Sequence, residues 1–322
     1  QIETLIDANL AKKLANNDDL GRAKRIDGVQ DRYVEFAKRT FPRQLSLDGV
    51  KVVVDCANGA GYKVAPRVLA DLGADIIPVG CSPNGRNINE ACGSTAPGLL
   101  QLTVPGVRAH VGIGLDGDGD RLIMVDTLGR IVDGDQLLYV IAKHRAAAGT
   151  LRGPVVGTVM SNFGLELALR DAGVEFRRAQ VGDRYVLALL KETGGILGGE
   201  TSGHLLCLDK ATTGDAIVSA LQVLAIMKET GRPLAELAAA MAQFPQKLIN
   251  VRTRVRFDVE SNAIVREEVA AVEKALAGQG RVVLRPSGTE PVIRVMVECR
   301  DELSARQHAE RLARAVERAA TT

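Results

Sequence analysis

Residues 50–61 read VKVVVDCANGAG, a run of mostly β-branched residues followed by a glycine-rich loop. Uninterrupted apolar runs of this kind are typical of strands buried on both faces of a parallel sheet. A helix is expected to follow the loop as far as Leu72, where Gly73 ends it, and a second strand is expected over residues 76–79. This order of elements predicts a βαβ unit.

The same pattern returns further along the chain. A strand is expected over residues 155–159, a helix over 163–172 with Ser161 and Asn162 as its cap, and another strand from Val174. The segment LADLG at 69–73 also resembles LRDAG at 169–173. We interpret the two regions as copies of one α/β module, each with a mixed sheet.

The last part of the chain has a different pattern. Strands are expected over residues 248–255, 281–284 and 292–297, and helices over 261–276 and 302–319. That order predicts a small α+β domain with an antiparallel sheet. The predicted organisation is a helical remnant over 1–42, α/β domains over 43–134 and 135–247, and the α+β domain over 248–322.

Composition limits the classes of function. The 322 residues are 46% hydrophobic and 25% charged, an ordinary balance for a soluble globular protein. A net charge of +2 argues against nucleic acid as the main partner, and no apolar run is long enough to cross a membrane. Five cysteines, an odd number without a C-x-x-C pair, favour a reduced, cytoplasmic protein.

The beginning of the chain lacks an initiator methionine. Ile2, Leu5, Ile6 and Leu10 recur at near-helical spacing, and no capping residue precedes them. We therefore expect the sequence to begin inside a helix and to be a truncated chain.

The most specific motif is GLDGDGDR at residues 114–121, which places Asp116, Asp118 and Asp120 at alternate positions. Glycine spacers allow the three carboxylates to converge, and a hard divalent cation would relieve their repulsion. A calcium loop is excluded because its sixth position should be Gly and is Arg121, and its twelfth should be Glu and is Thr127. Mg²⁺ is the predicted ion, and a solvated acidic turn is the alternative.

Two further loops suggest ligand binding. LGGETSGH at residues 197–204 can bring Glu200, Ser202 and His204 close to a polyol, and His204 could act as a general acid or base. RPSGTEP at residues 285–291, followed by Arg294, combines guanidinium, hydroxyl and backbone N–H donors that suit a phosphate. The alternatives are a tight turn with a satisfied histidine and an ordinary hairpin turn.

These three loops, in this order, resemble the α-D-phosphohexomutase superfamily, and the resemblance covers nearly the whole chain. The superfamily has three related α/β domains and a fourth, TATA-protein-like domain, which correspond here to domains two, three and four. The amino-sugar branch is most similar, on the segments INEACGST, GRAKR, VGDRYV and RVMVE at 88–95, 21–25, 181–186 and 294–298. That branch usually has Gln where Thr201 stands.

The resemblance implies roles for individual residues. Asp116, Asp118 and Asp120 would bind Mg²⁺, and Arg121 would face the transferring phosphate. Glu200 and Ser202 would read sugar hydroxyls beside His204. The substrate's other phosphate would be held by Arg285, Ser287, Gly288, Thr289 and Arg294. The superfamily's nucleophile, a phosphoserine in an S-x-S-H-N-like loop, has no counterpart in these 322 residues.

The reaction implied is the interconversion of 6- and 1-phosphates of glucosamine through a 1,6-bisphosphate, and the fragment alone is expected to be inactive. A phosphoglucomutase or phosphomannomutase, or a non-catalytic sugar-phosphate-binding paralogue, remains an alternative. A phosphatase with an aspartate nucleophile would leave the sugar and phosphate loops unexplained. The sequence is also compatible with a homodimer.

Overall fold

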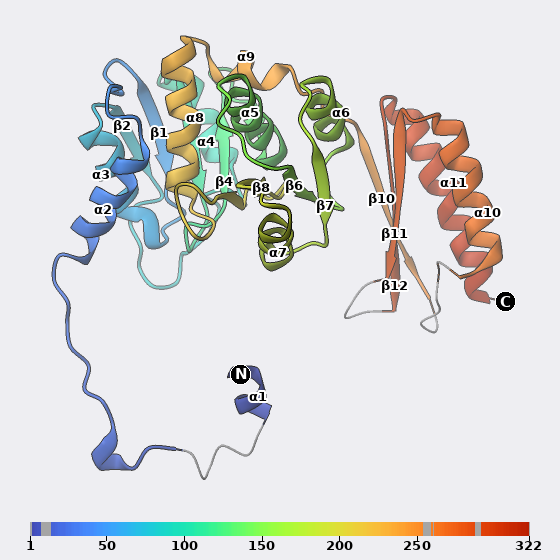
Figure 1. Ribbon diagram of the computed structural model, residues 1–322, viewed down its shortest axis with the longest axis horizontal. Coiled ribbons are helices and arrows are strands. Elements are labelled where there is room, and N and C mark those ends of the chain that lie inside the picture. The colour runs from blue at the N-terminus through green and yellow to red at the C-terminus, as the bar shows by residue number, and fades with distance from the viewer. Residues whose placement is uncertain (1, 8–13, 254–258, 260, 287–290, 322) are drawn as a thin grey trace.

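The computed structural model describes all residues except 1, 8–13, 254–258, 260, 287–290 and 322. Figure 1 shows an N-terminal arm, two α/β layers that lie side by side, and a separate C-terminal sheet with its helices. None of the described helices combines the length and the apolar character that a membrane crossing requires. All five cysteines are free thiols.

The first sheet is mixed and has the strand order β2-β1-β3-β4-β5. β1 runs parallel to β2 and β3, whereas β4 is antiparallel to β3 and to β5. Its strands are β1 (Lys51–Asp55), β2 (Asp75–Val79), β3 (Val111–Leu115), β4 (Leu122–Val125) and β5 (Ile131–Val132). The accompanying helices are α3 (Val64–Asp71), α4 (Gly98–Gly106) and the 3₁₀ turn η3 (Ala60–Tyr62).

The second sheet repeats this arrangement with the order β7-β6-β8-β9. β6 is parallel to β7 and β8, and β9 is antiparallel to β8, so the predicted repeat and the mixed sheets are confirmed. Its strands are β6 (Val155–Thr158), β7 (Phe176–Ala179), β8 (Leu197–Gly199) and β9 (Leu205–Cys207). The helices here are α5 (Gly134–Ala147), α6 (Phe163–Asp171), α7 (Asp183–Thr193), α8 (Ala216–Thr230) and α9 (Leu234–Ala239).

Helix α8 packs between the two α/β domains (Figure 1). Residues 216–226 are all buried, and the helix packs on β3 and β4 of the first sheet as well as on β9 and α5 of the second. A helix that is apolar on every face belongs in an interior. One hydrophobic cluster therefore extends through both α/β domains, with Leu221 and Leu224 of α8 among its members.

The C-terminal domain has its own core and an antiparallel sheet in the order β10-β12-β11. Its strands are β10 (Gln246–Arg252), β11 (Gly280–Pro286) and β12 (Val292–Cys299). Its helices, α10 (Ala263–Leu276) and α11 (Glu302–Thr321), pack on each other and on one side of the sheet (Figure 1). The predicted α+β architecture is confirmed.

The N-terminal region differs from the helix expected over the first 40 residues. The described helices there are α1 (Ile2–Asp7) and α2 (Val29–Thr40), with a 3₁₀ turn, η2 (Asn17–Asp19), between them. Asn, Asp and Gly are poor helix formers, and they are concentrated between residues 16 and 28. The predicted boundaries after residues 42, 134 and 247 stay predictions.

The spacing of Tyr33, Phe36, Ala37 and Phe41 predicts a buried face on α2, and the prediction is wrong for Phe36. Phe36 is 41% exposed, whereas Val34, Ala37 and Phe41 are buried. The buried set has the spacing i, i+3, i+7 of one helical face, and Phe36 lies beside that face. α2 packs against α3 and α8, so it belongs physically with the first sheet.

Candidate active site

The acidic loop connects β3 to β4, whose register pairs Leu115 with Leu122. Asp116, Asp118 and Asp120 each offer a carboxylate oxygen, and these oxygens all lie within 4.8 Å of one another. A side chain at Gly59 would meet the Gly117 carbonyl oxygen at 2.2 Å, so glycine is required where the loop after β1 passes the acidic loop. The convergence expected from the sequence is present.

Arg121 neutralises part of this negative charge. Its backbone N–H donates to Asp116 Oδ1 at 3.0 Å, and its Nε donates to Asp116 Oδ2 at 2.6 Å. Burial alone would raise the pKa of Asp116, but these hydrogen bonds outweigh it and hold the pKa below its usual value. Asp116 is therefore an ionised carboxylate with a fixed orientation.

Asp120 has a different environment. Burial, and then the negative charge of Asp116, raises the pKa of Asp120. Its Oδ1 is buried and has no hydrogen-bond partner among the described residues. Such an unsatisfied acidic oxygen, beside two other carboxylates, fits an oxygen-ligated cation such as Mg²⁺.

The loop between β8 and β9 contacts the acidic loop directly. Arg121 and His204 form an antiparallel bridge, and Leu122 donates its N–H to the Gly203 carbonyl at 3.0 Å. A side chain at Gly203, whose φ is +93°, would meet the Leu122 carbonyl at 1.9 Å. Glycine is therefore required where the two sheets bring their loops together.

His204 links the two loops through its side chain. It is 7% exposed, and its Nδ1 lies 3.0 Å from Asp120 Oδ2. Its Nε2 has no partner among the described residues. A side chain at Gly214 would lie 2.3 Å from that nitrogen, so glycine leaves the space that the ring occupies. The imidazole is held at Nδ1, and its Nε2 is buried without a hydrogen-bond partner in the described part of the chain.

The two predicted sugar readers lie on the same loop. Glu200 Oε1 accepts a hydrogen bond from the Gly182 N–H at 2.9 Å, which ties the loop to the start of α7. Ser202 is exposed. No described contact occupies the Ser202 hydroxyl, so it is available to a ligand.

The predicted phosphate site is described only in part. Arg285 on β11 and Arg294 on β12 are paired directly across the sheet. Like charges opposite each other on neighbouring strands are unfavourable, and among the described residues neither guanidinium forms an ion pair. A bound phosphate would relieve this repulsion. Ser287, Gly288 and Thr289 lie outside the described residues.

Tyr33 and Asp215 were not singled out as site residues by the sequence. They line a cavity of 370 Å³ beside Asp118 and Asp120. Asp215 caps α8 by accepting from the Val218 N–H at 2.9 Å, and it also accepts from the Tyr33 hydroxyl at 2.9 Å. Burial, and then the charge of Asp215, raises the pKa of Tyr33, so this hydroxyl is a proton donor.

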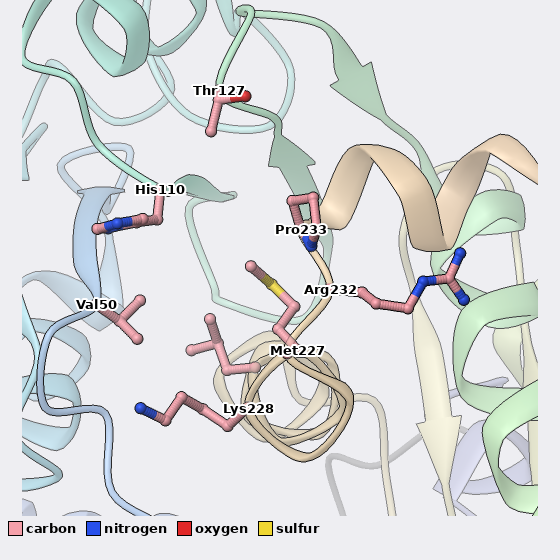
Figure 2. A pocket seen from close by; sticks show the side chains of 9 residues that line it. Val50, His110, Thr127, Met227, Lys228, Arg232 and Pro233 are labelled. Carbon is pink, nitrogen blue, oxygen red and sulfur yellow. The ribbon is translucent and has the colours of Figure 1, made fainter.

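A second cavity, of 310 Å³, lies at the opposite edge of the first sheet (Figure 2). Val50, Met227 and Pro233 line it together with His110 and Lys228. His110 accepts a hydrogen bond from the Lys51 N–H at 2.9 Å, which is a structural role. Active sites in such sheets lie at the carboxyl ends of the strands, where the acidic loop is, so we do not place the site here.

Comparison with known protein families agrees with this geometry. Three family descriptions match: "Phosphoglucomutase/phosphomannomutase, alpha/beta/alpha domain II" over residues 31–129, "alpha/beta/alpha domain III" over 133–244, and "C-terminal domain" over 248–315. The chain therefore belongs to the phosphoglucomutase/phosphomannomutase family, the α-D-phosphohexomutases.

Its sequence relatives are more specific. A phosphoglucosamine mutase of Chromobacterium violaceum is 56% identical over 319 residues, which cover 98% of this chain and 71% of the relative. A phosphoglucosamine mutase of Legionella pneumophila is 53% identical over 313 residues, 97% of this chain and 69% of the relative. The phosphoglucosamine mutases are thus the branch in which the chain falls.

Solved structures show the same fold. A phosphoglucomutase/phosphomannomutase family protein from Burkholderia thailandensis superposes with a TM-score of 0.74 at 23% identity, over 90% of this chain and 64% of its own. An Aspergillus fumigatus N-acetylphosphoglucosamine mutase, crystallised with GlcNAc-6P and magnesium, gives 0.71 at 22% identity, over 89% and 70%.

Proposed function

We propose that this chain provides the metal, sugar and phosphate sites of an enzyme that interconverts glucosamine 6-phosphate and glucosamine 1-phosphate. The observation that carries the proposal is the junction of the acidic loop with the sugar loop, which is the connection between β8 and β9 at residues 200–204. There the backbones of Arg121 and His204 form a β-bridge, and Asp120 contacts the imidazole. Groups that neutralise phosphate charge and groups that bind hydroxyls thereby face one site. The amino-sugar relatives support the choice of substrate.

The residues of the acidic loop divide the work of charge neutralisation. Asp116, Asp118 and Asp120 would hold Mg²⁺, which when bound withdraws charge from phosphate oxygens. Arg121 keeps Asp116 ionised, and because its side chain is 40% exposed it can also reach a phosphate oxygen. Phosphoryl transfer depends on such positioning and neutralisation more than on covalent chemistry by the protein.

The other two sites would orient the sugar. Glu200 and Ser202 bind hydroxyls, and His204, whose Nε2 is buried without a hydrogen-bond partner among the described residues, is the predicted general acid or base beside them. Arg285 and Arg294, together with the predicted Ser287, Gly288 and Thr289, grip the phosphate that is not being transferred. Because the sugar must bind in two orientations during the proposed reaction, these residues recognise the phosphate and not the sugar ring.

The phosphoryl donor of the proposed reaction is a phosphoserine outside these 322 residues. It would transfer its phosphoryl group to the sugar, giving a 1,6-bisphosphate that turns over before the other phosphate returns to the serine. These 322 residues alone are therefore expected to bind Mg²⁺ and sugar phosphate without catalysing the interconversion. A cytoplasmic location and a homodimer stay predictions.

Calorimetry on the 322-residue chain tests the proposal. Glucosamine 6-phosphate should bind in the presence of Mg²⁺ and more weakly after the metal is chelated, with glucose and mannose 6-phosphates as competitors. Tighter binding of glucose or mannose phosphate would favour the alternative mutases. No binding of any hexose phosphate would refute the site. Rapid interconversion by these residues alone would refute the requirement for a phosphoryl donor outside them.

A further inference from the structure

The first turn of α5 holds the sugar loop at Thr201. The Gly134 N–H donates to the Thr201 carbonyl at 3.2 Å, and the Thr201 hydroxyl donates to Asp135 Oδ2 at 2.7 Å. A side chain at Gly134 would lie 2.1 Å from the Glu200 carbonyl, so the helix starts directly against the loop. The residue between Glu200 and Ser202 is therefore fixed by both its backbone and its side chain.

Asp135 is fully buried, which makes this contact more than incidental. The Asn162 N–H also donates to its Oδ2, at 2.7 Å. Burial raises the pKa of Asp135, while hydrogen bonds from Asn162, Thr201 and Ser161 act in the opposite direction. A carboxyl group without water depends on such donors, so the loss of the Thr201 hydroxyl would leave it poorly satisfied.

Hydrogen bonds continue from Asp135 to the C-terminal domain. The neighbouring Ser161 carbonyl accepts from Arg178 at 2.7 Å and from Arg281 at 2.6 Å. Arg281 lies on β11, the strand that also carries Arg285. One polar network thus joins the sugar loop to the strand that leads to the predicted phosphate site.

We propose that Asp135 is a positioning residue that fixes the sugar loop through Thr201, and that the Thr201 hydroxyl is committed to this contact and does not read the sugar. The inference rests on the proposed function only in naming the ligand of the loop. Glu200 and Ser202, on either side of Thr201, then bind the sugar hydroxyls. The contact of Thr201 with the start of α5 fixes the distance between them.

Three variants separate this role from general stability. Thr201→Val keeps the shape and removes the hydroxyl, Thr201→Ser keeps the hydroxyl, and Asp135→Asn weakens the acceptor. Thr193→Val is the matched control, because its hydroxyl bonds only to carbonyls of its own helix, that of Leu189 at 2.7 Å and that of Leu190 at 3.5 Å. Each variant is studied in the 322-residue chain with Mg²⁺ present.

Amide hydrogen exchange is the first measurement. The Gly134 N–H, which donates to Thr201, and the Gly203 N–H, which donates to Glu200 at 2.9 Å, report on the loop. Loss of the hydrogen bond between Thr201 and Asp135 should speed their exchange about tenfold in Thr201→Val and Asp135→Asn. Thr201→Ser should restore slow exchange, and Thr193→Val should leave it unchanged. Equal exchange in wild type and Thr201→Val would overturn the proposal.

Calorimetry is the second measurement, with glucosamine 6-phosphate and inorganic phosphate as ligands. Thr201→Val should weaken sugar phosphate binding about tenfold and change phosphate binding less than about twofold, with rescue by Thr201→Ser. The positioning role would be overturned if Thr201→Ser failed to restore binding, or if Thr201→Val weakened the binding of both ligands equally. If the wild-type chain binds no sugar phosphate, the proposed function fails, and the exchange measurement still decides whether Asp135 anchors the loop.

Discussion

Nδ1 of His204 lies 3.0 Å from Oδ2 of Asp120, so the sugar loop and the acidic loop share a hydrogen bond. The contact occupies one oxygen of Asp120 and leaves the other, which lies 3.7 Å from Arg121 Nε, without a hydrogen-bond partner among the described residues. Nε2 of the ring is buried and has no hydrogen-bond partner in the part of the chain that the structure describes. His204 thereby orients a candidate metal ligand.

The orienting role of His204 predicts an effect on metal binding. His204→Ala should weaken Mg²⁺ binding about threefold to tenfold, because Asp120 loses the group that fixes it. His204→Asn places an amide N–H near the position of Nδ1 and should retain more of the affinity. Calorimetric titration with Mg²⁺ measures both. His110→Ala is the control, since His110 lies at the other edge of the sheet, and equal losses in the Ala and Asn variants would contradict the role.

Asp118 is the exposed member of the acidic cluster, which permits a substitution with little structural cost. Asp118→Asn should weaken Mg²⁺ binding at least about tenfold, since hard cations depend on ligand charge. Without metal, the variant should melt at the same temperature as wild type or higher, because a like-charge repulsion is removed. Melting curves with and without Mg²⁺ test this, with exposed Asp171→Asn as control. Full stabilisation of Asp118→Asn by Mg²⁺ would reject the metal assignment.

The parts of the site that the sequence predicted are local in the chain. Asp116, Asp118 and Asp120 converge because glycine spacers occur between them, and such spacing is visible without a fold. The loop also follows a β-branched strand, whose carboxyl end is where such loops gather. The repeat of βαβ units was visible for the same reason, since it rests on periodicity and capping within short segments.

The contacts that join the loops were not predicted, because they depend on tertiary packing. His204 is 84 residues from Asp120, and Tyr33 is 182 residues from Asp215. No periodicity encodes such pairs. Phe36 was misplaced for a related reason: its hydrophobicity suggested burial, whereas the packing of α2 on α3 and α8 selected the face with Val34 and Ala37.

Asp133 predicts a pH-dependent contribution to stability. Burial raises the pKa of this carboxyl from 3.8 to about 6. Because the folded state holds the proton more tightly, this contribution is fully present below pH 3.8 and is lost as pH rises towards 6. The loss amounts to about 3 kcal/mol at most.

Asp133→Asn should therefore gain stability relative to wild type as pH rises from about 4.5 to 7. Asn also caps helices well, so the bond to the Gln136 N–H at 3.0 Å should survive. Urea unfolding of both proteins at the two pH values measures the difference, with Asp171→Asn as control. A difference that does not change with pH would contradict the shifted pKa.

The contact between the C-terminal domain and the second sheet centres on Arg281 and Glu298. Arg281 donates to Glu298 and to the carbonyls of Val159 at 2.8 Å and Ser161 at 2.6 Å. Glu298 is fully buried and also accepts from the Phe163 N–H at 3.2 Å, at the start of α6. Both charged side chains belong to the C-terminal domain, and both form hydrogen bonds to backbone groups of the second α/β domain.

Arg281→Ala should destabilise the protein by about 3–5 kcal/mol, because it leaves a buried carboxylate without its cation. The double variant R281M/E298Q should lose less, since no unpaired charge remains. Arg311→Ala, which breaks an exposed pair with Glu268, should cost no more than about 1 kcal/mol. Urea unfolding measures the losses.

Hydrogen exchange at the Phe163 amide then separates a loosened domain contact from global unfolding. Only a loosened contact speeds exchange at this amide while the core of α8 stays protected. Equal losses in the single and double variants would show that packing, and not the buried charge, holds the two domains together.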